Sequence, residues 1–189
     1  YWYVGGHRDN FPQVITSKYP IENVERIVGE EPDSVVTHGA GWARIVKNGR
    51  TVNIVTLHLW PQAYAYRATD VAASRDAHEG DRYRRMEIEY ICRHTIGTAP
   101  RAAEELWVML GDFNSWSRFD NWFYKCPEDD PRLLTQDYVL EHTPYVDVIA
   151  RQHPGRFQTT THSEKRIDFV YCTPALYDCV TRAEVVRDD

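Results

Sequence analysis

The chain has 189 residues, of which 42% are hydrophobic and 26% are charged, the composition of an ordinary globular protein. This excludes a disordered chain, a collagen and a coiled coil, and the length suits a single domain over residues 1–189. With 28 acidic and 22 basic residues the formal charge is −6, so the chain lacks the basic field of a non-specific nucleic-acid binder.

Neither the start of the sequence nor its cysteines decide in which cellular compartment the protein is found. No apolar stretch reaches the roughly 18 residues that suggest a membrane span. The sequence begins at Tyr1 rather than at a methionine, so we expect a processed or incomplete start. A secreted or periplasmic location is compatible with a leader that was removed. The four cysteines show neither C-x-x-C metal spacing nor the density of a disulfide scaffold.

The first sixty residues are predicted to be mostly β-structure. Apolar runs over 41–46 and 51–59 flank Asn48-Gly49, two residues that tolerate the positive φ angles of a tight hairpin turn. Upstream, two short strands over 13–16 and 23–28 are expected on either side of another turn.

A helix and a buried strand are predicted in the middle of the chain. Apolar residues recur at helical spacing over 81–96, and Gly97 provides a stop signal. The segment from Leu106 to Leu110 is apolar at every position. This favours a strand that is buried on both faces and central in its sheet.

The last part of the chain is predicted to form two helical pieces and a strand. The helical pieces fall within 129–152 and are separated at Pro144. The strand covers 166–171. Its period of two puts Ile167, Phe169 and Tyr171 on one face, and Asp168 with Val170 on the other.

The most informative local feature is Gly111-Asp112-Phe113-Asn114, directly after the apolar strand. Polar groups at the end of a buried strand line a crevice. Asp112 is suited to be a general base, and the Asn114 amide is suited to stabilise a developing oxyanion. A turn followed by an asparagine cap is the structural alternative at this position.

Two further polar residues lie in apolar strands. His58, near the end of the 51–59 strand, can donate or accept a proton, although a lone strand histidine is more often a hydrogen-bonded structural residue. Asp168 is a carboxylate between bulky apolar neighbours and needs a partner if it is buried. An ion pair with Arg166 is its structural alternative.

Three motifs follow one another in chain order, and together they are a far more specific signal of function than each one alone. They are the strand with His58, the strand followed by Gly-Asp-Phe-Asn, and the strand Arg166-Ile167-Asp168-Phe169. The combination resembles the endonuclease/exonuclease/phosphatase superfamily of metal-dependent phosphoesterases, which includes DNase I-like nucleases, sphingomyelinases and inositol-polyphosphate phosphatases. Ser17-Lys18-Tyr19-Pro20-Ile21 is similar to a Ser-Arg-Tyr-Pro-Ile segment common there. The resemblance covers about residues 11 to 180 and implies an α/β (α+β) fold, the four-layer αββα sandwich.

The resemblance also implies a role for each candidate residue. Asp112 would orient or deprotonate the attacking water, Asn114 would hydrogen-bond phosphoryl oxygens, and His58 would contact the phosphate or act as an acid. Asp168 matches a carboxylate that pairs in this family with the histidine of a terminal Ser-Asp-His segment. The implied cofactor is Mg²⁺ or Mn²⁺, with Asp112 as one candidate ligand.

The sequence departs from the family pattern at both ends. It stops at Asp189 without a Ser-Asp-His segment, and nothing before Tyr1 supplies the early strands that carry the family's metal-binding Asn and Glu. We therefore expect a single domain that lacks N-terminal strands and its C-terminal end in this chain. The remaining metal ligands are expected outside it, and these 189 residues alone are not expected to form a complete metal site.

Substrate contacts are expected from Trp60 and Tyr64, in the loop after His58, and from Arg166. For five aromatic residues we favour a helix face packed into the core over a substrate platform: Trp116, Phe119, Trp122, Phe123 and Tyr124. For three arginines we favour a solvated, ion-paired helix face: Arg82, Arg84 and Arg85.

The first hypothesis for function is a metal-dependent hydrolase of phosphate esters, in the phosphodiesterase, phosphatase or nuclease class. Its partner would be a phosphorylated substrate, nucleic acid included, although the acidic charge favours a smaller molecule. The alternative is a non-catalytic module that binds a phosphate ligand on the same fold. We expect a monomer, and we expect four residues to converge on one cleft: His58, Asp112, Asn114 and Asp168.

Overall fold

The apolar and alternating stretches form the strands of one six-stranded sheet. The structure, a computed structural model, describes residues 1–5, 11–29, 36–62 and 69–186. The sheet order is β3-β4-β5-β6-β8-β7. The strands are β3 (Ile21–Ile27), β4 (Ala40–Lys47), β5 (Arg50–His58), β6 (Leu106–Asp112), β7 (Val146–Asp147) and β8 (Asp168–Cys172). Two further strands, β1 (Trp2–Gly5) and β2 (Gln13–Thr16), pair with each other.

The connections of the central strands decide which strand ends meet. β4 and β5 form an antiparallel hairpin, whose turn residues Asn48 and Gly49 have φ angles of 51° and 73°. β5 and β6 are parallel, because the chain returns through a helix before it re-enters the sheet. β8 is antiparallel to β6. The carboxyl ends of β5 and β6 therefore lie beside the amino end of β8.

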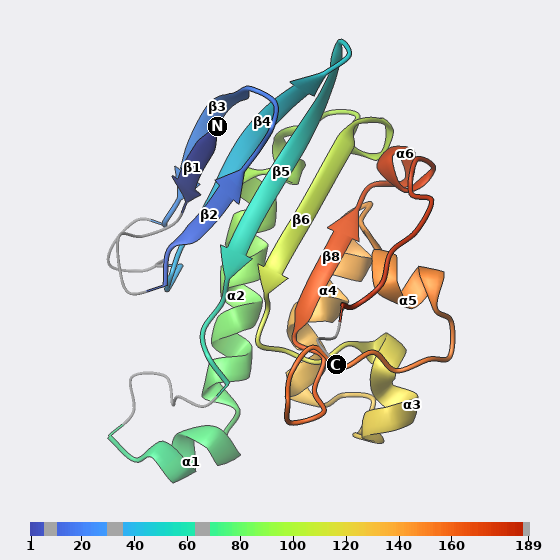
Figure 1. Cartoon of the computed structure of the whole chain (residues 1–189). Coiled ribbons are helices and arrows are strands. Elements are labelled where there is room, and N and C mark those ends of the chain that lie inside the picture. Colours follow the sequence, from blue (N-terminus) through green and yellow to red (C-terminus); the bar gives the residue numbers. More distant parts are fainter. Residues whose placement is uncertain (6–10, 30–35, 63–68, 187–189) are drawn as a thin grey trace.

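Helices cover one face of the six-stranded sheet (Figure 1). The longest is α2 (Glu79–His94), which lies behind β5 and β6 in that view and packs against α4 (Leu134–His142). The other helices are short: α1 (Val71–Asp76), α3 (Asn121–Tyr124), α5 (Val148–Gln152) and α6 (Pro174–Tyr177). Single 3₁₀ turns lie at 96–98, 102–104, 118–120 and 131–133.

The core lies between this helix layer and the sheet. Met109 and Tyr171 from the strands, and Ile88 and Ile91 from α2, are completely buried. The prediction that β6 is central in the sheet is confirmed. The prediction that it is buried on both faces is wrong, because Val108 and Leu110, which point away from α2, are only half-buried.

The small β1–β2 sheet lies over β3, β4 and β5, on the face away from α2 (Figure 1). Its inward-facing Ile15 is 6% exposed. The helices, the six-stranded sheet and this smaller sheet thus form successive layers. The expected α/β (α+β) class is confirmed, and the described residues form three layers of the expected four-layer αββα sandwich.

Most predicted elements are confirmed, with boundaries shifted by a few residues. The predicted helix over 81–96 is α2, and the hairpin strands are β4 and β5. The region 129–152 does form two helices interrupted at Pro144, but β7 lies between them. Prediction from sequence missed β1 and α1. All four cysteines are free thiols.

Two predictions about side-chain burial are wrong. Phe119, Trp122 and Phe123 are 51%, 53% and 40% exposed instead of packed into the core, because their segment forms only a 3₁₀ turn and a four-residue helix. Arg84 is 3% exposed rather than solvated. Its guanidinium bonds the backbone of the loop after β5, a contact that helical spacing does not reveal.

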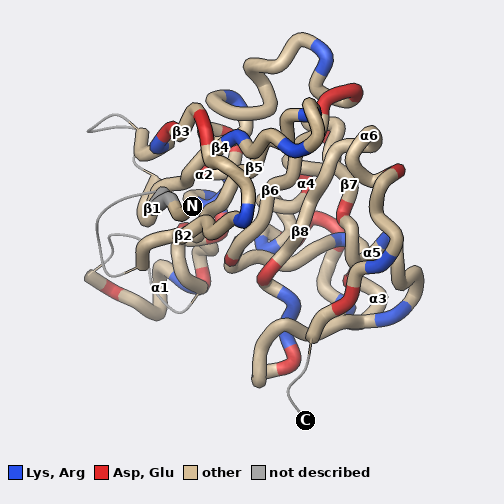
Figure 2. Tube along the Cα trace, turned by 45° about the horizontal axis from the view of Figure 1, so that its top comes forward, with Lys and Arg blue, Asp and Glu red and all other residues tan. Residues whose placement is uncertain are grey.

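Charges of both signs are spread over the molecule. In the view of Figure 2, basic and acidic residues alternate along the trace without a large face of one sign. Among the described residues, no helix combines the length and the hydropathy needed to cross a bilayer.

Candidate active site at the strand ends

Three of the predicted residues lie in one row across the sheet. His58 is the Cα partner of Asp112 in the parallel β5–β6 pair, and Asp112 is the Cα partner of Asp168 in the antiparallel β6–β8 pair. Residues in such a row point to the same face of a sheet. These side chains point away from α2, because their neighbours Leu57 and Phe169 are buried on the helix side. The row is therefore one polar edge at the ends of β5 and β6.

Gly111 allows the strands to meet closely next to this row. Its φ is +145°, and a Cβ atom at this position would lie 1.9 Å from the carbonyl oxygen of Leu57. Any side chain there would push β5 and β6 apart. The glycine therefore keeps His58 and Asp112 in register.

His58 is held against Asp112 by ring contacts as well as by the sheet. Its Nε2 atom lies 3.7 Å from Asp112 Oδ2, and 22% of its side chain is exposed. The His58 ring packs on His38 with centroids 4.6 Å apart, and on Phe11 at 5.4 Å. His38, which precedes β4, was not predicted as part of the site, because no nearby motif marks it. The two rings restrict the orientation of the His58 imidazole.

Asp112 is the carboxylate most affected by this environment. Burial and the neighbouring charge of Asp168 raise its pKa from 3.8 to about 6, although the backbone N–H of Asn114 donates to its Oδ1 at 2.8 Å. Partial burial of the carboxylate also raises the pKa of Asp168, while a hydrogen bond from the Thr160 side chain lowers it. Asp168 itself is exposed, so it does not need the partner that a buried carboxylate would need. A pKa near neutrality is a property of general bases in enzymes.

Asn114 turns the chain away from the row and fixes the neighbouring loop. Its φ is 50°, its side chain is buried, and its Nδ2 donates to the carbonyl oxygen of Leu59 at 3.1 Å. Its Oδ1 accepts from the backbone N–H of Gln62 at 3.3 Å. The amide therefore holds the loop after β5, and the predicted contact with a phosphoryl oxygen would use its remaining N–H.

The loop after β5 is also held by α2. Trp60 donates its backbone N–H to Glu87 Oε2 at 2.9 Å and accepts from Arg84 Nη1 at 2.8 Å. The second oxygen of Glu87 accepts from Thr37 at 2.7 Å. Burial raises the pKa of Glu87, while these bonds lower it. Both anchors were missed by sequence reasoning, because charged residues on a helix are usually solvated.

The predicted substrate-binding residues lie in different environments. Trp60 is half-buried, with its ring edge-on to Tyr83 at 5.9 Å between centroids. Tyr64 lies outside the described residues. Arg166 is 1% exposed and its guanidinium bonds Asp120 at 3.0 Å and Asp147, neither of which lies in the row. Arg166 thus lies beneath the site, where its pairing with buried carboxylates fixes the approach to β8, rather than at its surface.

The row supplies some, but not all, of the ligands that a hard divalent cation needs. Mg²⁺ is usually bound by one or two carboxylates together with water and substrate phosphate. Asp112 and Asp168 supply two carboxylates on adjacent strands, and the pKa of Asp112 is raised partly by its acidic neighbour. No group of three or more metal-ligating side chains occurs among the described residues.

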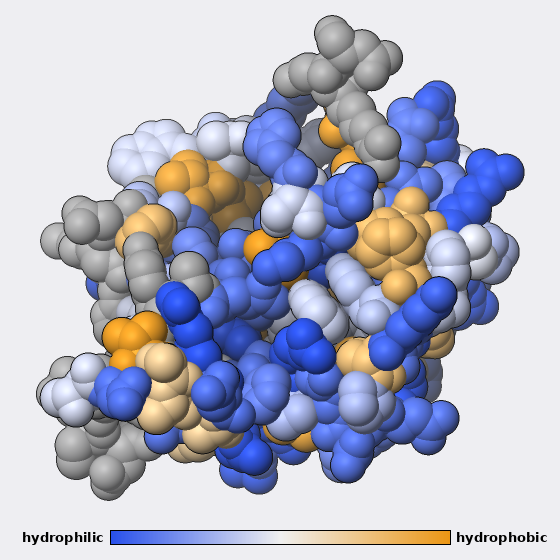
Figure 3. Space-filling view, turned by 90° about the horizontal axis from the view of Figure 1, so that it is seen from below, coloured by the Kyte–Doolittle hydropathy of each residue, from blue (hydrophilic) through white to orange (hydrophobic). Residues whose placement is uncertain are grey.

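The surface around the strand ends is mainly hydrophilic. Figure 3 looks along the sheet from the side where β5 and β6 end, and it shows polar residues across the centre of the face with hydrophobic ones in separate patches. Three of the four residues expected to converge therefore share a polar edge, and Asn114 lies directly behind it.

Comparison with solved structures shows the fold of this chain. The catalytic domain of human Nocturnin with a bound sulfate anion matches with a TM-score of 0.58 and 11% identity, over 92% of this chain and 60% of that one. An endonuclease/exonuclease/phosphatase from Beutenbergia cavernae matches with a TM-score of 0.57 and 16% identity, over 92% and 46%. D. rerio TDP2 complexed with a single-strand DNA product matches with a TM-score of 0.52 and 14% identity, over 92% and 61%.

These similarities confirm the predicted DNase I-like, endonuclease/exonuclease/phosphatase fold. The chain spans between about half and three-fifths of the length of the structures it matches. No protein-family profile and no curated protein sequence matches it.

Proposed function

We propose that this protein hydrolyses phosphate esters with a divalent metal ion, Mg²⁺ or Mn²⁺. The observation that carries the proposal is the row of His58, Asp112 and Asp168, brought into register by three adjacent strands at one polar edge. The row places a base, an imidazole and a second carboxylate side by side. These groups can activate a water molecule for attack on phosphorus. The shared fold, seen in Nocturnin and TDP2, is consistent with this class.

In this proposal Asp112 is the general base. Its carboxylate takes a proton from water as the water oxygen attacks phosphorus, and the ester P–O bond breaks. A pKa of about 6 leaves Asp112 mostly ionised at neutral pH yet basic enough to accept a proton. The hydrogen bond from the backbone of Asn114 to Oδ1 fixes the carboxylate, so that Oδ2 faces His58.

The other residues of the row bind and orient the phosphate. His58 would donate a hydrogen bond to a phosphate oxygen or a proton to the leaving oxygen. Asp168, together with Asp112, would hold the divalent ion. When bound, such an ion neutralises charge on the phosphate oxygens. Asn114 keeps the loop with Trp60 beside the row, where its free amide hydrogen would reach substrate.

The proposed substrates include both phosphodiesters and phosphomonoesters. The net charge of −6 and the mixed charges along the trace favour a small phosphorylated molecule over non-specific binding to nucleic acid (Figure 2). The retained alternative is a module that binds a phosphate ligand without turnover.

The test is hydrolysis of bis-p-nitrophenyl phosphate and p-nitrophenyl phosphate by the full gene product with Mg²⁺ or Mn²⁺. Asp112→Asn should lower the rate by about 10²–10⁴-fold, because it removes the base but leaves an oxygen for the bond from Asn114. Asp178→Asn, at an exposed aspartate in the turn after α6, is the matched control. Chelator-sensitive turnover that Asp112→Asn abolishes supports the enzyme. A folded protein that binds phosphate but turns over neither ester supports the binding module.

A further inference from the structure

A second polar pocket adjoins the row. Its volume is about 240 Å³. It is lined by the loop after β5, α1, the start of α2, the segment after β6, the 3₁₀ turn at 131–133 and the loop before β8. Residues that define it are Gln62, Arg75, His78, Arg84, Arg132 and Lys165. None of them is among the groups given to the hydrolytic step.

The pocket is basic in a protein that is acidic overall. Four of its lining residues are arginine or lysine, and only Asp81 is acidic, whereas the whole chain carries a charge of −6. Arg84 is paired with Asp81, and Arg132 with Asp130, whose Oδ1 lies 2.8 Å from Arg132 Nε. The ammonium of Lys165 forms no ion pair with any described residue. Lys165 therefore adds a positive charge to the lining beyond the pairs that Arg84 and Arg132 form.

Several of these cations are fixed in position before any ligand binds. Arg84 is buried and is held by the carbonyl oxygen of Trp60, and the guanidinium of Arg132 stacks on the Trp116 ring at 3.9 Å. Guanidinium groups that are already held in place favour an anionic ligand over a neutral one.

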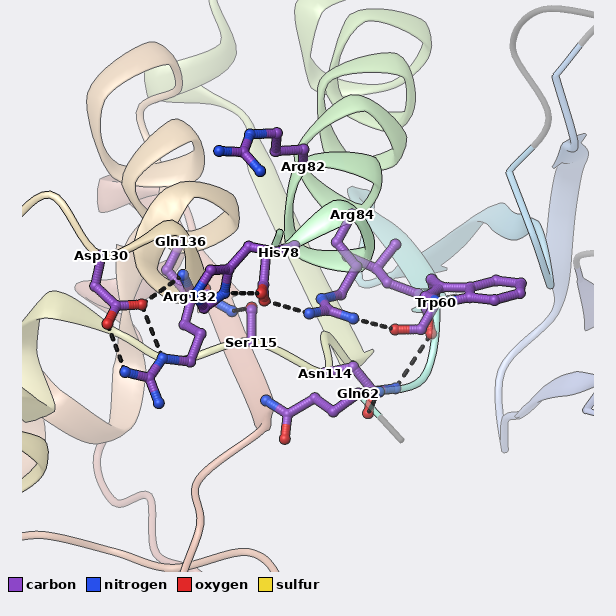
Figure 4. A network of polar contacts seen from close by, with 12 residues as sticks. Trp60, Gln62, His78, Arg82, Arg84, Asn114, Ser115, Asp130, Arg132 and Gln136 are labelled. Atoms are coloured by element: carbon purple, nitrogen blue, oxygen red, sulfur yellow. Dashed lines mark hydrogen bonds and ion pairs between the residues drawn. The ribbon is translucent and has the colours of Figure 1, made fainter. Parts of the chain in front are cut away.

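The pocket and the row are linked through Asn114, which hydrogen-bonds both Asp112 and Gln62. Gln62 lines the pocket, and its backbone N–H donates to Asn114, while Lys165 lies three residues before Asp168. Figure 4 shows Gln62 extending from Asn114 toward Arg132, with Arg84 and Trp60 on the other side. A ligand with two anionic groups could therefore occupy both sites.

We infer that this pocket, defined by Arg75, Arg84, Arg132 and Lys165, receives a second phosphate group of the substrate whose other phosphate lies at Asp112. The inference rests on the proposed function for the identity of the first phosphate. It narrows the substrate class to molecules with at least two phosphates. The neighbouring phosphate in a single-stranded oligonucleotide and the second phosphate of a small bisphosphate present the same anionic group.

Binding without turnover tests the pocket by itself. Inorganic phosphate is titrated calorimetrically into the full protein in the absence of metal, at low salt. Lys165→Ala should weaken phosphate binding about tenfold, and Lys165→Arg should largely restore it. Lys47→Ala is the matched control, because it removes one cation at the end of β4, next to the hairpin turn and far from the row. Equal phosphate affinity in wild type, Lys165→Ala and Arg75→Ala would overturn the inference.

Turnover connects the pocket to the row. The substrates are dithymidine monophosphate with and without an added 5′-phosphate, and a small bisphosphate ester beside its monophosphate. The added phosphate should lower KM about tenfold with kcat little changed, and Lys165→Ala should remove that advantage. If the second phosphate lowers KM only for the dinucleotide, the pocket recognises an oligonucleotide. If it lowers KM equally for the dinucleotide and the small bisphosphate, the pocket recognises the phosphate group alone. Turnover that is indifferent to the second phosphate refutes the inference.

The two proposals fail in different ways. If no ester is hydrolysed while Lys165→Ala still weakens phosphate binding, the proposed function is wrong and the basic pocket stands as an anion site. If esters are hydrolysed in an Asp112-dependent manner but phosphate affinity is the same in all lysine variants, the function stands and the pocket assignment is wrong. Thermal melts of each variant identify any loss of folding, and Lys165→Gln, which also removes the charge, then replaces the alanine variant.

Discussion

Asp112→Asn should make the protein more stable while it removes activity. The folded state raises the pKa of Asp112 from 3.8 to about 6, so the folded protein holds this proton more tightly than the unfolded chain does. Between these two pH values the folded state binds more protons, and the free energy of unfolding falls as pH rises. Above about pH 6 the full penalty of the ionised carboxylate is present.

The size of this penalty follows from the pKa difference. At the standard conversion for one pH unit, the change from 3.8 to about 6 corresponds to about 3 kcal/mol. Because 28% of the Asp112 side chain is exposed, solvent reduces the cost, and we expect roughly 1–3 kcal/mol. For a chain of this size, that gain raises Tm by roughly 2–10 °C.

The assay is thermal and urea unfolding of wild type and Asp112→Asn from pH 4 to pH 7.5 without metal. The stability difference should be largest above about pH 6 and should be mostly lost at pH 4, where the carboxylate is protonated in the folded state and only partly ionised in the unfolded chain. Asp178→Asn should change little at any pH. A variant that is no more stable than wild type at pH 7.5 would refute the reasoning, because the carboxylate would then carry no desolvation cost.

The second carboxylate gives an internal check on the cause. The charge of Asp168 contributes to the raised pKa of Asp112, so Asp168→Asn should relieve part of the same penalty. The double variant should therefore gain less than the sum of the single gains. Mg²⁺ should raise the Tm of wild type more than that of Asp112→Asn, because the ion binds only where the carboxylates remain.

Three further outcomes are expected. The kcat/KM of hydrolysis should rise with pH and level off by about pH 6, because the Asp112 base must be ionised and a bound cation lowers its pKa from the metal-free value of about 6. Activity that falls as the pH rises from about 4 to about 6 in a pH–rate profile would contradict that role. Arg166→Met should lower the free energy of unfolding by about 3–5 kcal/mol in urea titrations, because it leaves Asp120 and Asp147 buried without their cation. Arg182→Met, at an exposed ion pair, should leave the unfolding midpoint unchanged. Gly111→Ala should cost more than about 4 kcal/mol or prevent folding, because its Cβ would lie 1.9 Å from the Leu57 oxygen, while Gly49→Ala, with open space around it, should cost only about 1 kcal/mol in the same titration.

The sequence predicts the row well because strand periodicity and strand ends are local properties. His58 and Asp112 each end an apolar stretch, and Asp168 begins one, so their polarity stands out against their neighbours. Gly111-Asp112-Phe113-Asn114 also marks the turn itself. The register between strands is not local, but a parallel β5–β6 pair and an antiparallel β8 leave few ways to align these three positions.

Contacts made by helix residues could not be predicted in this way. Arg84 and Glu87 have the spacing of a solvated helix face, and only the tertiary structure turns them toward Trp60. Arg166 was predicted to face the substrate or to pair with its neighbour Asp168, yet it is buried with Asp120 and Asp147. Long cationic side chains reach partners distant in sequence, so their roles depend on packing.

The same packing accounts for the basic pocket beside an acidic row. Glu87 and Arg84 fix the loop after β5 through Trp60, and Asn114 fixes the end of that loop at Gln62. Gln62 therefore contacts Asn114 through its backbone and lines the pocket together with Arg132 and Lys165. If the row binds a divalent ion and the pocket binds a phosphate, as we propose, a substrate with two phosphates would be held at the pocket while its other phosphate lies beside Asp112.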